Sequence, residues 1–504
     1  MKPQKNDILE ICINDLGNEG EGIGHLDNGY TLFVKGALPG ELVRVGVMKA
    51  GKSYGYARLL AIIKPSKERV KPACPLAGKC GGCTLQHLSY EGQLRYKQKK
   101  VMDCLERISG IDMKDTGGVK TFPIIGMDDP WHYRNKAQFP VGVGKDGKTT
   151  VGVYAGRSHS ILPIEDCKIQ DTVTSEVRKR LLLFMKEGNV SPYDEASHTG
   201  TIRHIYIRKS NATGEVMVCL IVNESCGRFA KRYSELLIKV FGDIKGMVSI
   251  QVNENRKKTN VIMGENSVTV WGKGYIEDRI GNVRYMISGE SFFQVNPKQT
   301  LKLYETVLDF ADLKDDDTVW DMYCGIGTIS LFLAKAVGEN GKVVGVEIVE
   351  RAIKDARINA ELNGLKNVRF VCGSAENIGS VSEEKPDAIV LDPPRKGCDE
   401  EVLRAIGQMK VEKVVYVSCN PGTLARDVKL LGEMGYEVGK VQAVDFFPMG
   451  HHVETVVLLS HKKPDSYINV KVEFGEGKGK VPLDAIAERA EEYKPKERVT
   501  YKMI

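Results

Sequence analysis

The sequence predicts a multidomain chain with a small N-terminal β-barrel, a central α+β unit and a C-terminal α/β unit built on a doubly wound parallel sheet. Three observations predict this fold class. The length of 504 residues allows three or four domains. Short alternating segments broken by glycines fill residues 1–63, and from about residue 290 strand and helix patterns alternate at the spacing of βαβ units.

The composition excludes a disordered or membrane-embedded chain, because 42% of the residues are hydrophobic and 27% are charged. The longest apolar runs are strand-length, far short of the roughly 20 residues needed to cross a bilayer. The N-terminal segment MKPQKNDILE lacks the apolar region of a secretory signal. We therefore expect a cytoplasmic protein without membrane contact, whose 12 cysteines are thiols, metal ligands or nucleophiles. No feature demands a dimer, and we expect a monomer.

Residues 1–63 are expected to form a small all-β unit, because segments such as DILEICIND and ELVRVGVMKA alternate and are separated by glycine turns. This pattern suits an OB-like barrel, whose surface binds oligonucleotides, although an SH3-like barrel or a mere packing lid would also fit. Between Lys49 and Lys71 there are seven basic residues and one acid, Glu68, so this segment carries a net charge of +6, equal to that of the whole chain. Such a basic stripe indicates a polyanionic partner.

The rest of the chain divides into three further segments. Residues 64–289 are expected to form the central α+β unit, in which a helix over 89–109 is predicted from apolar residues at helical spacing and could pack on the C-terminal unit. Residues 290–460 form the predicted Rossmann-like unit. Residues 461–504 are a charged, glycine-containing extension of unknown role.

Four cysteines stand apart from the others. Cys74, Cys80 and Cys83 lie close together in a proline-punctuated segment, and Cys167 far downstream could complete a set of four thiolates. A tetrahedral sulfur site indicates zinc or an iron–sulfur cluster. Zinc ribbons usually have two close pairs, whereas here three cysteines are grouped and one is distant. The spacing of the cysteines is compatible with zinc and with an iron–sulfur cluster. The alternative to a metal site is that the four cysteines are unrelated buried thiols.

A glycine loop follows the first strand of the C-terminal unit. Gly325 and Gly327 let the backbone turn tightly and approach a ligand, and Glu347, which ends the next strand, could accept the hydroxyls of a ribose. A dinucleotide site would share this layout. Two features argue against NAD, because Ser330 stands in place of a third glycine and Asp321 precedes the loop. An acid at this position matches S-adenosylmethionine (SAM) methyltransferases.

Three chemically useful residues lie at strand ends of the same unit. Asp392 follows the strand DAIVL and precedes two prolines that stiffen the loop. Cys419 follows the strand VVYVS, where it could act as a nucleophile, but a free thiol is only a few per cent thiolate at neutral pH and buried cysteines are usually inert. Glu454 begins the strand VETVVLL and could reach the same edge, or serve only as a solubilising charge.

The segments FFQVN, DMYCGIGT, LDPPRKG, VSCNP and HHVETV, in this order, resemble the bacterial RNA uracil-C5 methyltransferases. The N-terminal barrel resembles the TRAM domain of RNA-modifying enzymes, so the resemblance covers about residues 5–460. The chain is most similar to the 23S ribosomal RNA branch, because the transfer-RNA branch generally lacks both the barrel and the four cysteines. The resemblance implies a 23S ribosomal RNA partner, SAM as cofactor and a [4Fe–4S] cluster on Cys74, Cys80, Cys83 and Cys167.

The resemblance also implies a role for each residue of the site. Cys419 would add to C6 of uracil so that C5 can accept the methyl group of SAM, and Glu454 would then remove the proton from C5. Phe292 and Phe293 are candidates to stack on the base once it leaves its stack. The implied SAM contacts are Gln294, Tyr323, Glu347, Asp392, Thr328 and Ser374.

Four other functions stay open at this point. Amino-methyltransferases also use an Asp-Pro-Pro loop but need no cysteine, a different RNA such as tRNA could be the substrate, and an NAD-dependent enzyme would share the glycine loop. The fourth function is that of an RNA-binding protein that has lost its catalytic activity. Against it, the sequence retains all four of the proposed site residues Cys419, Asp392, Glu454 and Gln294.

Overall fold

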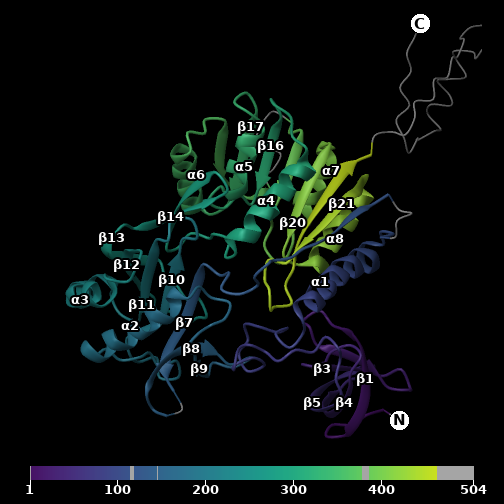
Figure 1. Ribbon diagram of the computed structural model, residues 1–504. Helices are drawn as coiled ribbons and strands as arrows, with labels where there is room; N and C mark the ends of the chain where they lie inside the picture. The colour runs from purple at the N-terminus through teal and green to yellow at the C-terminus, as the bar shows by residue number, and fades with distance from the viewer. Residues whose placement is uncertain (1, 114–117, 145, 377–384, 463–504) are drawn as a thin grey trace, which may run out of the picture. The chain divides into compact units, whose positions relative to one another are not determined.

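The computed structural model describes residues 2–113, 118–144, 146–376 and 385–462 (Figure 1). The chain divides into two units, Met1–His461 and Lys462–Ile504. The predicted extension over 461–504 lies outside the described residues apart from His461 and Lys462. No helix in the described ranges is long and apolar enough to cross a bilayer.

The N-terminal residues form a closed barrel with the strand order β1-β2-β3-β5-β4. Alternate residues such as Leu32, Val34 and Val45 are buried in its interior, while their neighbours along the strands face outward. The barrel predicted from the alternating segments is therefore confirmed. Its strands are β1 (Ile8–Leu16), β2 (Gly22–His25), β3 (Thr31–Lys35), β4 (Leu42–Ala50) and β5 (Tyr54–Lys64).

One residue of the basic stripe has a partner inside the protein. The guanidinium group of Arg69 donates to the carboxylate of Glu41 at 2.5 and 2.8 Å and to the carbonyl oxygen of Gly36 at 2.7 Å. Glu41 is buried, so Arg69 neutralises a carboxylate of the barrel and is not part of the exposed stripe. The sequence could not show this, because the two residues are 28 positions apart. The exposed residues of the stripe are Lys49, Lys52, Arg58, Lys64, Lys67 and Lys71.

A seven-stranded sheet in the order β13-β12-β11-β10-β7-β8-β9 forms the central part. Every residue of β11 is buried, because α2 and α3 cover one face of the sheet and the hairpin β14–β15 packs on the other. The strands are β7 (Lys136–Val143), β8 (Thr149–Tyr154), β9 (Ile161–Pro163), β10 (Ile202–Lys209), β11 (Val216–Val222), β12 (Met247–Glu254), β13 (Asn266–Gly272), β14 (Tyr275–Ile280) and β15 (Val283–Ser288). The helices are α2 (Val173–Glu187) and α3 (Cys226–Phe241).

An eight-stranded sheet in the order β18-β17-β16-β19-β20-β22-β21-β6 forms the C-terminal part. Strands β16 to β20 are parallel, as the alternating strand and helix patterns predict, and β22 runs antiparallel to β20 and β21. The chain reverses its winding between β16 and β19, the place where such sheets bind ligands. The strands are β16 (Thr318–Met322), β17 (Lys342–Glu347), β18 (Val368–Cys372), β19 (Ala388–Leu391), β20 (Lys413–Ser418), β21 (Tyr436–Val444) and β22 (Glu454–His461).

The last strand of this sheet, β6 (Lys120–Ile125), comes from a distant part of the sequence and pairs parallel with β21. It lies within residues 64–289, which the sequence assigns to the central unit, so the C-terminal sheet recruits a strand from outside residues 290–460. The short strand carries no signal of which sheet it joins, because strand pairing depends on tertiary packing.

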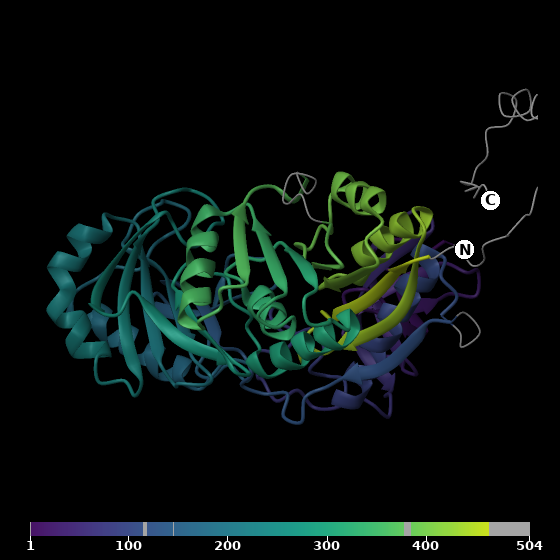
Figure 2. The same cartoon turned by 90° about the horizontal axis from the view of Figure 1, so that it is seen from above.

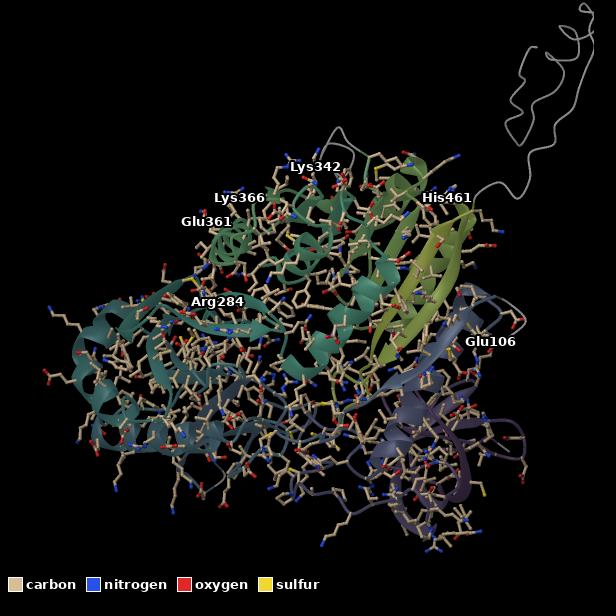
Figure 3. The ribbon with its side chains drawn as sticks, turned by 45° about the horizontal axis from the view of Figure 1, so that its top comes forward. Glu106, Arg284, Lys342, Glu361, Lys366 and His461 are labelled. Atoms are coloured by element: carbon tan, nitrogen blue, oxygen red, sulfur yellow. The ribbon has the colours of Figure 1, made fainter. Side chains whose placement is uncertain are left out.

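Helices cover both faces of the C-terminal sheet (Figure 2). Helices α4 (Pro297–Ala311), α5 (Thr328–Ala336) and α6 (Glu350–Leu362) pack on one face. The other face is covered by α1 (Tyr90–Cys104), the π-helical turn η1 (Leu105–Ser109), α7 (Glu400–Met409) and α8 (Pro421–Glu433). Helix α1, which the apolar spacing predicts, therefore packs on the catalytic sheet. Lys342 and His461 mark the edge where β17 begins and β22 ends (Figure 3).

Candidate active site

A cavity of about 840 Å³ opens at the opposite edge of the sheet, where the parallel strands end. Its volume is within the range of small-molecule sites. Side chains from the loops after β16, β17, β19 and β20, from the start of β22 and from the segment before α4 line it. The cavity brings together all the residues that the sequence suggests for catalysis and SAM binding. These are Gln294, Tyr323, Thr328, Glu347, Ser374, Asp392, Cys419 and Glu454.

The glycine loop between β16 and α5 shapes one wall of the cavity. Tyr323, Gly325 and Gly327 all have positive φ angles, of 69°, 55° and 82°. A Cβ atom added to Gly325 would meet no atom within 4 Å, so this position leaves room toward the cavity. The backbone N–H of Gly325 donates to Oε2 of Glu347 at 3.2 Å. The loop therefore fixes the Glu347 carboxylate at the end of β17, where a ribose hydroxyl could reach it.

Asp321 does not line this cavity. Its buried carboxylate accepts a hydrogen bond from Oγ of Ser330 at 2.5 Å, and burial raises its pKa to about 7. Ser330, which stands in place of a third glycine, thus anchors the first turn of α5 to the end of β16. The second oxygen of Asp321, Oδ1, is buried without a hydrogen-bond partner among the described residues.

Two further carboxylates line the cavity, and Asp392 lies beside the glycine loop, because its backbone N–H donates to the carbonyl oxygen of Met322 at 3.4 Å. Burial raises the pKa of Asp392, at the end of β19, to about 7. Burial, and then the nearby charge of Asp392, raises the pKa of Glu454 to about 8, while Arg395 opposes the shift. Without a ligand, both groups therefore hold their protons close to neutral pH, and a positive charge in the cavity would favour their ionised forms.

Cys419 lies between β20 and α8, beside Asn420, whose Oδ1 accepts a hydrogen bond from the N–H of Gly422 at 3.0 Å and caps the helix. A helix N-terminus favours a thiolate. Burial and then the charge of Glu454 act in the opposite direction and raise the pKa of Cys419 to about 11. Burial and the neighbouring carboxylate therefore outweigh the helix N-terminus, and the pKa of the Cys419 thiol lies above that of a free cysteine.

Arg395 is a residue of the site that the sequence did not single out for a role. It lines the cavity and lowers the pKa of both Cys419 and Glu454, although burial outweighs it in each case. His452 also lines the cavity, and burial lowers its pKa to about 3, so that it is neutral. The sequence could have indicated Arg395, because this residue directly follows the Asp-Pro-Pro segment at the edge of the sheet where ligands bind.

The loop 445–453, which leads into β22, is held by two distant segments. Lys97 of α1 forms an ion pair with Asp445, and both side chains are fully buried. The backbone N–H groups of Thr84 and of the next residue each donate to the carbonyl oxygen of Met449 at 3.0 Å. Helix α1 and the cysteine-rich segment therefore fix the backbone that positions Glu454.

The two adjacent phenylalanines have different environments. Phe293 is 1% exposed and packs against the ring of Tyr285, with centroids 5.6 Å apart. Phe292 is 65% exposed at the cavity, and Nζ of Lys136 lies 5.9 Å from its ring centroid. Only Phe292 is therefore free to stack on a base.

Cys74, Cys80, Cys83 and Cys167 line a second cavity of about 230 Å³, and all four are free thiols. Burial raises the pKa of Cys83 to about 12, and the charges of the other three cysteines add to the shift. The N–H of Gly82 donates to Sγ of Cys80 at 3.3 Å. Four thiols around one cavity, with a backbone donor to sulfur, fit a sulfur-bound metal group.

Within the described ranges, no group of three or more His, Cys, Asp or Glu side chains has the arrangement of a metal site. The structure therefore places the four thiols around one cavity and does not show a metal group on them.

The doubly wound sheet, the glycine loop and the acids at its carboxyl edge form a cofactor site of the kind that SAM-dependent methyltransferases share with dinucleotide enzymes. Comparison with known proteins gives the family. The family described as tRNA (uracil-5-)-methyltransferase matches residues 90–462, and the TRAM domain matches residues 3–60. The chain therefore belongs to the RNA uracil-5-methyltransferases and begins with a TRAM domain, which confirms the family that the motifs suggest.

Individual relatives agree with this assignment. An uncharacterized RNA methyltransferase of Clostridium tetani is 46% identical over 461 residues, covering 91% of this chain and 97% of the relative. One from Halalkalibacterium halodurans is 47% identical over 461 residues, covering 91% and 98%. The crystal structure of Pyrococcus abyssi tRNA (uracil-54, C5)-methyltransferase with S-adenosyl-L-homocysteine aligns with a TM-score of 0.69 at 30% identity, covering 90% of this chain and all of that one.

Proposed function

We propose that this enzyme methylates C5 of a uridine in 23S ribosomal RNA through a covalent bond between Cys419 and C6 of the base. The observation that carries the proposal is the register of β20 and β22, in which Ser418 is paired with Thr455, so that Cys419 and Glu454 are the next residues on neighbouring strands. Both residues line the cavity that the proposed SAM contacts also line. A nucleophile for C6 and a base for the C5 proton must act on adjacent ring carbons, so they need this proximity.

The reaction follows from these two groups. The Cys419 thiolate forms a bond to C6, which turns C5 into an enolate carbon. Bound SAM supplies an electrophilic methyl group on a sulfonium, whose positive charge also favours the ionised forms of the nearby thiol and acids. After C5 has taken the methyl group, the Glu454 carboxylate removes the C5 proton. The C6–S bond then breaks, which restores the aromatic ring and the thiolate.

The other residues of the cavity hold the reactants. Glu347 would bind the ribose of SAM, and Phe292 would stack on the target base after it leaves the RNA stack. The remaining proposed SAM contacts are Gln294, Tyr323, Thr328, Ser374 and Asp392.

We further propose that Cys74, Cys80, Cys83 and Cys167 hold a [4Fe–4S] cluster. Support comes from the single cavity that the four thiols line and from the backbone N–H of Gly82, which donates to Sγ of Cys80. The cluster would take no part in methyl transfer. It would stiffen the segment whose backbone contacts Met449 and so brace the loop that leads to Glu454.

A uridine of transfer RNA is the second candidate substrate. It is favoured by the Pyrococcus abyssi enzyme, which is named for uracil 54 of tRNA and aligns with 90% of this chain. The 23S RNA is favoured only by the resemblance of the motifs to the ribosomal branch, because the alignment with the tRNA enzyme covers 90% of this chain and therefore extends into the barrel. Either RNA is consistent with a cytoplasmic monomer.

Mapping of 5-methyluridine by mass spectrometry in RNA from cells with and without this gene separates the two substrates. We expect one or more 23S positions to lose the modification and to regain it with the wild-type gene but not with Cys419→Ala. Loss confined to tRNA would overturn the ribosomal assignment.

A further inference from the structure

The loop that follows β19 is fastened to the start of α8, the helix whose N-cap residue, Asn420, directly follows Cys419. Nδ2 of Asn420 and Oγ1 of Thr423 both donate to the carbonyl oxygen of Arg395, at 3.4 and 3.3 Å. Oδ1 of Asn420 accepts the capping hydrogen bond from the N–H of Gly422. The side chain of Asn420 therefore connects the residue next to the thiol with the backbone of Arg395.

Two residues on the following turn of α8 hold the same loop farther along. Nη2 of Arg426 donates to the carbonyl oxygens of Lys396 and Cys398, at 3.0 and 3.2 Å. Oδ2 of Asp427 accepts a hydrogen bond from the backbone N–H of Cys398 at 2.9 Å. Nε of Arg426 also donates to Oδ1 of Asp427 at 2.8 Å, so the two side chains act as one unit. We call Arg426 and Asp427 the clamp.

The carboxylate of the clamp lies in the interior of the protein. Asp427 is 1% exposed, and the hydroxyl of Tyr416 on β20 donates to its Oδ2 at 2.5 Å. The loop packs so closely on this carboxylate that a Cβ atom added to Gly397 would lie 2.5 Å from Oδ2. A buried carboxylate is stable only when it is paired and hydrogen-bonded. Movement of the loop would break this pairing, so the clamp holds the loop in one position.

The loop carries a cation that acts on the Cys419 thiol. The charged groups that influence this thiol are Glu454, at the start of β22, and Asp392 and Arg395, in the loop after β19. Burial raises the pKa of Cys419 and the two acids raise it further, whereas Arg395 lowers it. His452 lines the same cavity but is neutral, because burial lowers its pKa. The position of Arg395 therefore influences how much thiolate Cys419 provides.

We propose that the clamp is a positioning element for catalysis: it holds the loop after β19 so that the guanidinium group of Arg395 stays in the cavity with the thiol of Cys419 and favours its ionised form. That Cys419 is the nucleophile rests on the proposed function. Arg426 and Asp427 do not line the catalytic cavity, whereas Arg395 does. The clamp thus acts through Arg395 and not on the substrate.

The test measures how fast iodoacetamide alkylates Cys419 in the full-length protein between pH 7 and pH 9, read from the mass of the peptide that contains this residue. Only the thiolate reacts, so the rate at a given pH reports the ionisation of Cys419. We expect Asp427→Asn to slow alkylation roughly three- to tenfold, because Arg395 is no longer held. A direct effect of the lost negative charge, or easier access through a loosened loop, would speed alkylation instead.

A double-variant cycle tests whether the clamp acts through Arg395. In Arg395→Gln the cation is already gone, so adding Asp427→Asn should change the alkylation rate by less than about twofold. Leu431→Ala controls for lost stability. It removes a buried apolar side chain of α8, one turn beyond the clamp, that makes no hydrogen bond to the loop, and it should leave the alkylation rate unchanged.

Tyr416→Phe guards against misfolding of Asp427→Asn, because it keeps the ring in the core and the net charge while it removes one donor to the clamp carboxylate. It should also slow alkylation, by a smaller factor, and it decides the question alone if Asp427→Asn does not fold. Alkylation at the wild-type rate or faster in the folded variants would overturn the proposal. The same slowing in the Arg395→Gln background would overturn it as well.

Methylation assays keep this proposal separate from the proposed function. If the wild type methylates uridine and needs Cys419 to do so, while Asp427→Asn is alkylated normally, the clamp alone is refuted. If the expected alkylation pattern is found but methylation survives Cys419→Ala, the nucleophile assignment is refuted instead, and with it the catalytic purpose of the clamp.

Discussion

Lys97 and Asp445, which are 348 residues apart, form an ion pair from which water is excluded. Nζ of Lys97 also donates to the carbonyl oxygen of Phe447 at 2.9 Å, and the hydroxyl of Tyr90 donates to Asp445 at 2.8 Å. Burial lowers the pKa of Lys97, and Asp445 opposes this effect. Through this pair, a helix from outside the Rossmann-like segment fixes the loop that leads to the proposed base.

Removal of Lys97 should therefore lower the stability of the folded protein. Lys97→Met leaves a buried carboxylate without its cation, and we expect a loss of about 3–5 kcal/mol in the free energy of unfolding, measured by urea denaturation. The double variant with Asp445→Asn should recover much of that loss. Lys99→Met, on the same helix, breaks half-exposed pairs with Asp15 and Asp103 and should cost less than about 1 kcal/mol. Equal losses for the two single lysine variants would contradict this role of the pair.

Stability should depend on pH through Glu454. Its pKa is raised from 4.5 to about 8 in the folded protein, so the unfolded chain releases this proton first and the free energy of unfolding falls as pH rises through this range. Glu454→Gln removes that dependence, and between pH 4 and pH 8 we expect its free energy of unfolding to gain about 4 kcal/mol relative to the wild type. The control is Glu361→Gln on the exposed side of α6. Parallel pH curves for wild type and Glu454→Gln would refute the raised pKa.

The four cysteines should act together as ligands. Anaerobically purified protein should contain four irons and four acid-labile sulfides per chain, and Cys83→Ala should lose them along with part of its thermal stability. Cys372→Ala changes an exposed cysteine outside this cavity and should keep the full content. Stoichiometric zinc in the wild type would exclude the iron–sulfur cluster.

The basic stripe should contribute salt-dependent affinity for RNA. Lys64→Glu with Lys67→Glu, both exposed, should weaken binding by roughly tenfold and flatten its dependence on salt, while SAM affinity stays the same. Arg69→Glu should instead destabilise the barrel, because it removes the partner of buried Glu41. Filter-binding titrations at several salt concentrations measure the first effect. Unchanged RNA affinity in the double variant would show that the basic stripe is not part of the RNA-binding surface.

The sequence predicts the barrel and the parallel sheet because side-chain periodicity is a local property, visible in alternating strands and in strand–helix repeats. The candidate site follows in the same way. Asp392, Cys419 and Glu454 each stand at the end of a strand, and topology alone brings such ends to one edge of the sheet.

Features that depend on distant partners could not be predicted. The Lys97–Asp445 pair, the pairing of β6 with β21 and the burial of Glu41 beneath Arg69 each join segments whose contact no local pattern encodes. The further rise in the pKa of Cys419 belongs to the same class, because it is caused by burial and by the charges of Glu454 and Asp392, which lie at the ends of other strands.

The most direct test of the central claim uses substrate RNA that carries 5-fluorouridine at the target position. Glu454 can remove a proton from C5 but not a fluorine, so the bond between Cys419 and C6 should persist after methyl transfer. We predict a protein–RNA complex that survives denaturation, with the methylated base attached to the peptide containing Cys419, and no complex with Cys419→Ala although that variant still binds SAM. Methylation of normal RNA by Cys419→Ala, or an adduct on another residue, would contradict the account.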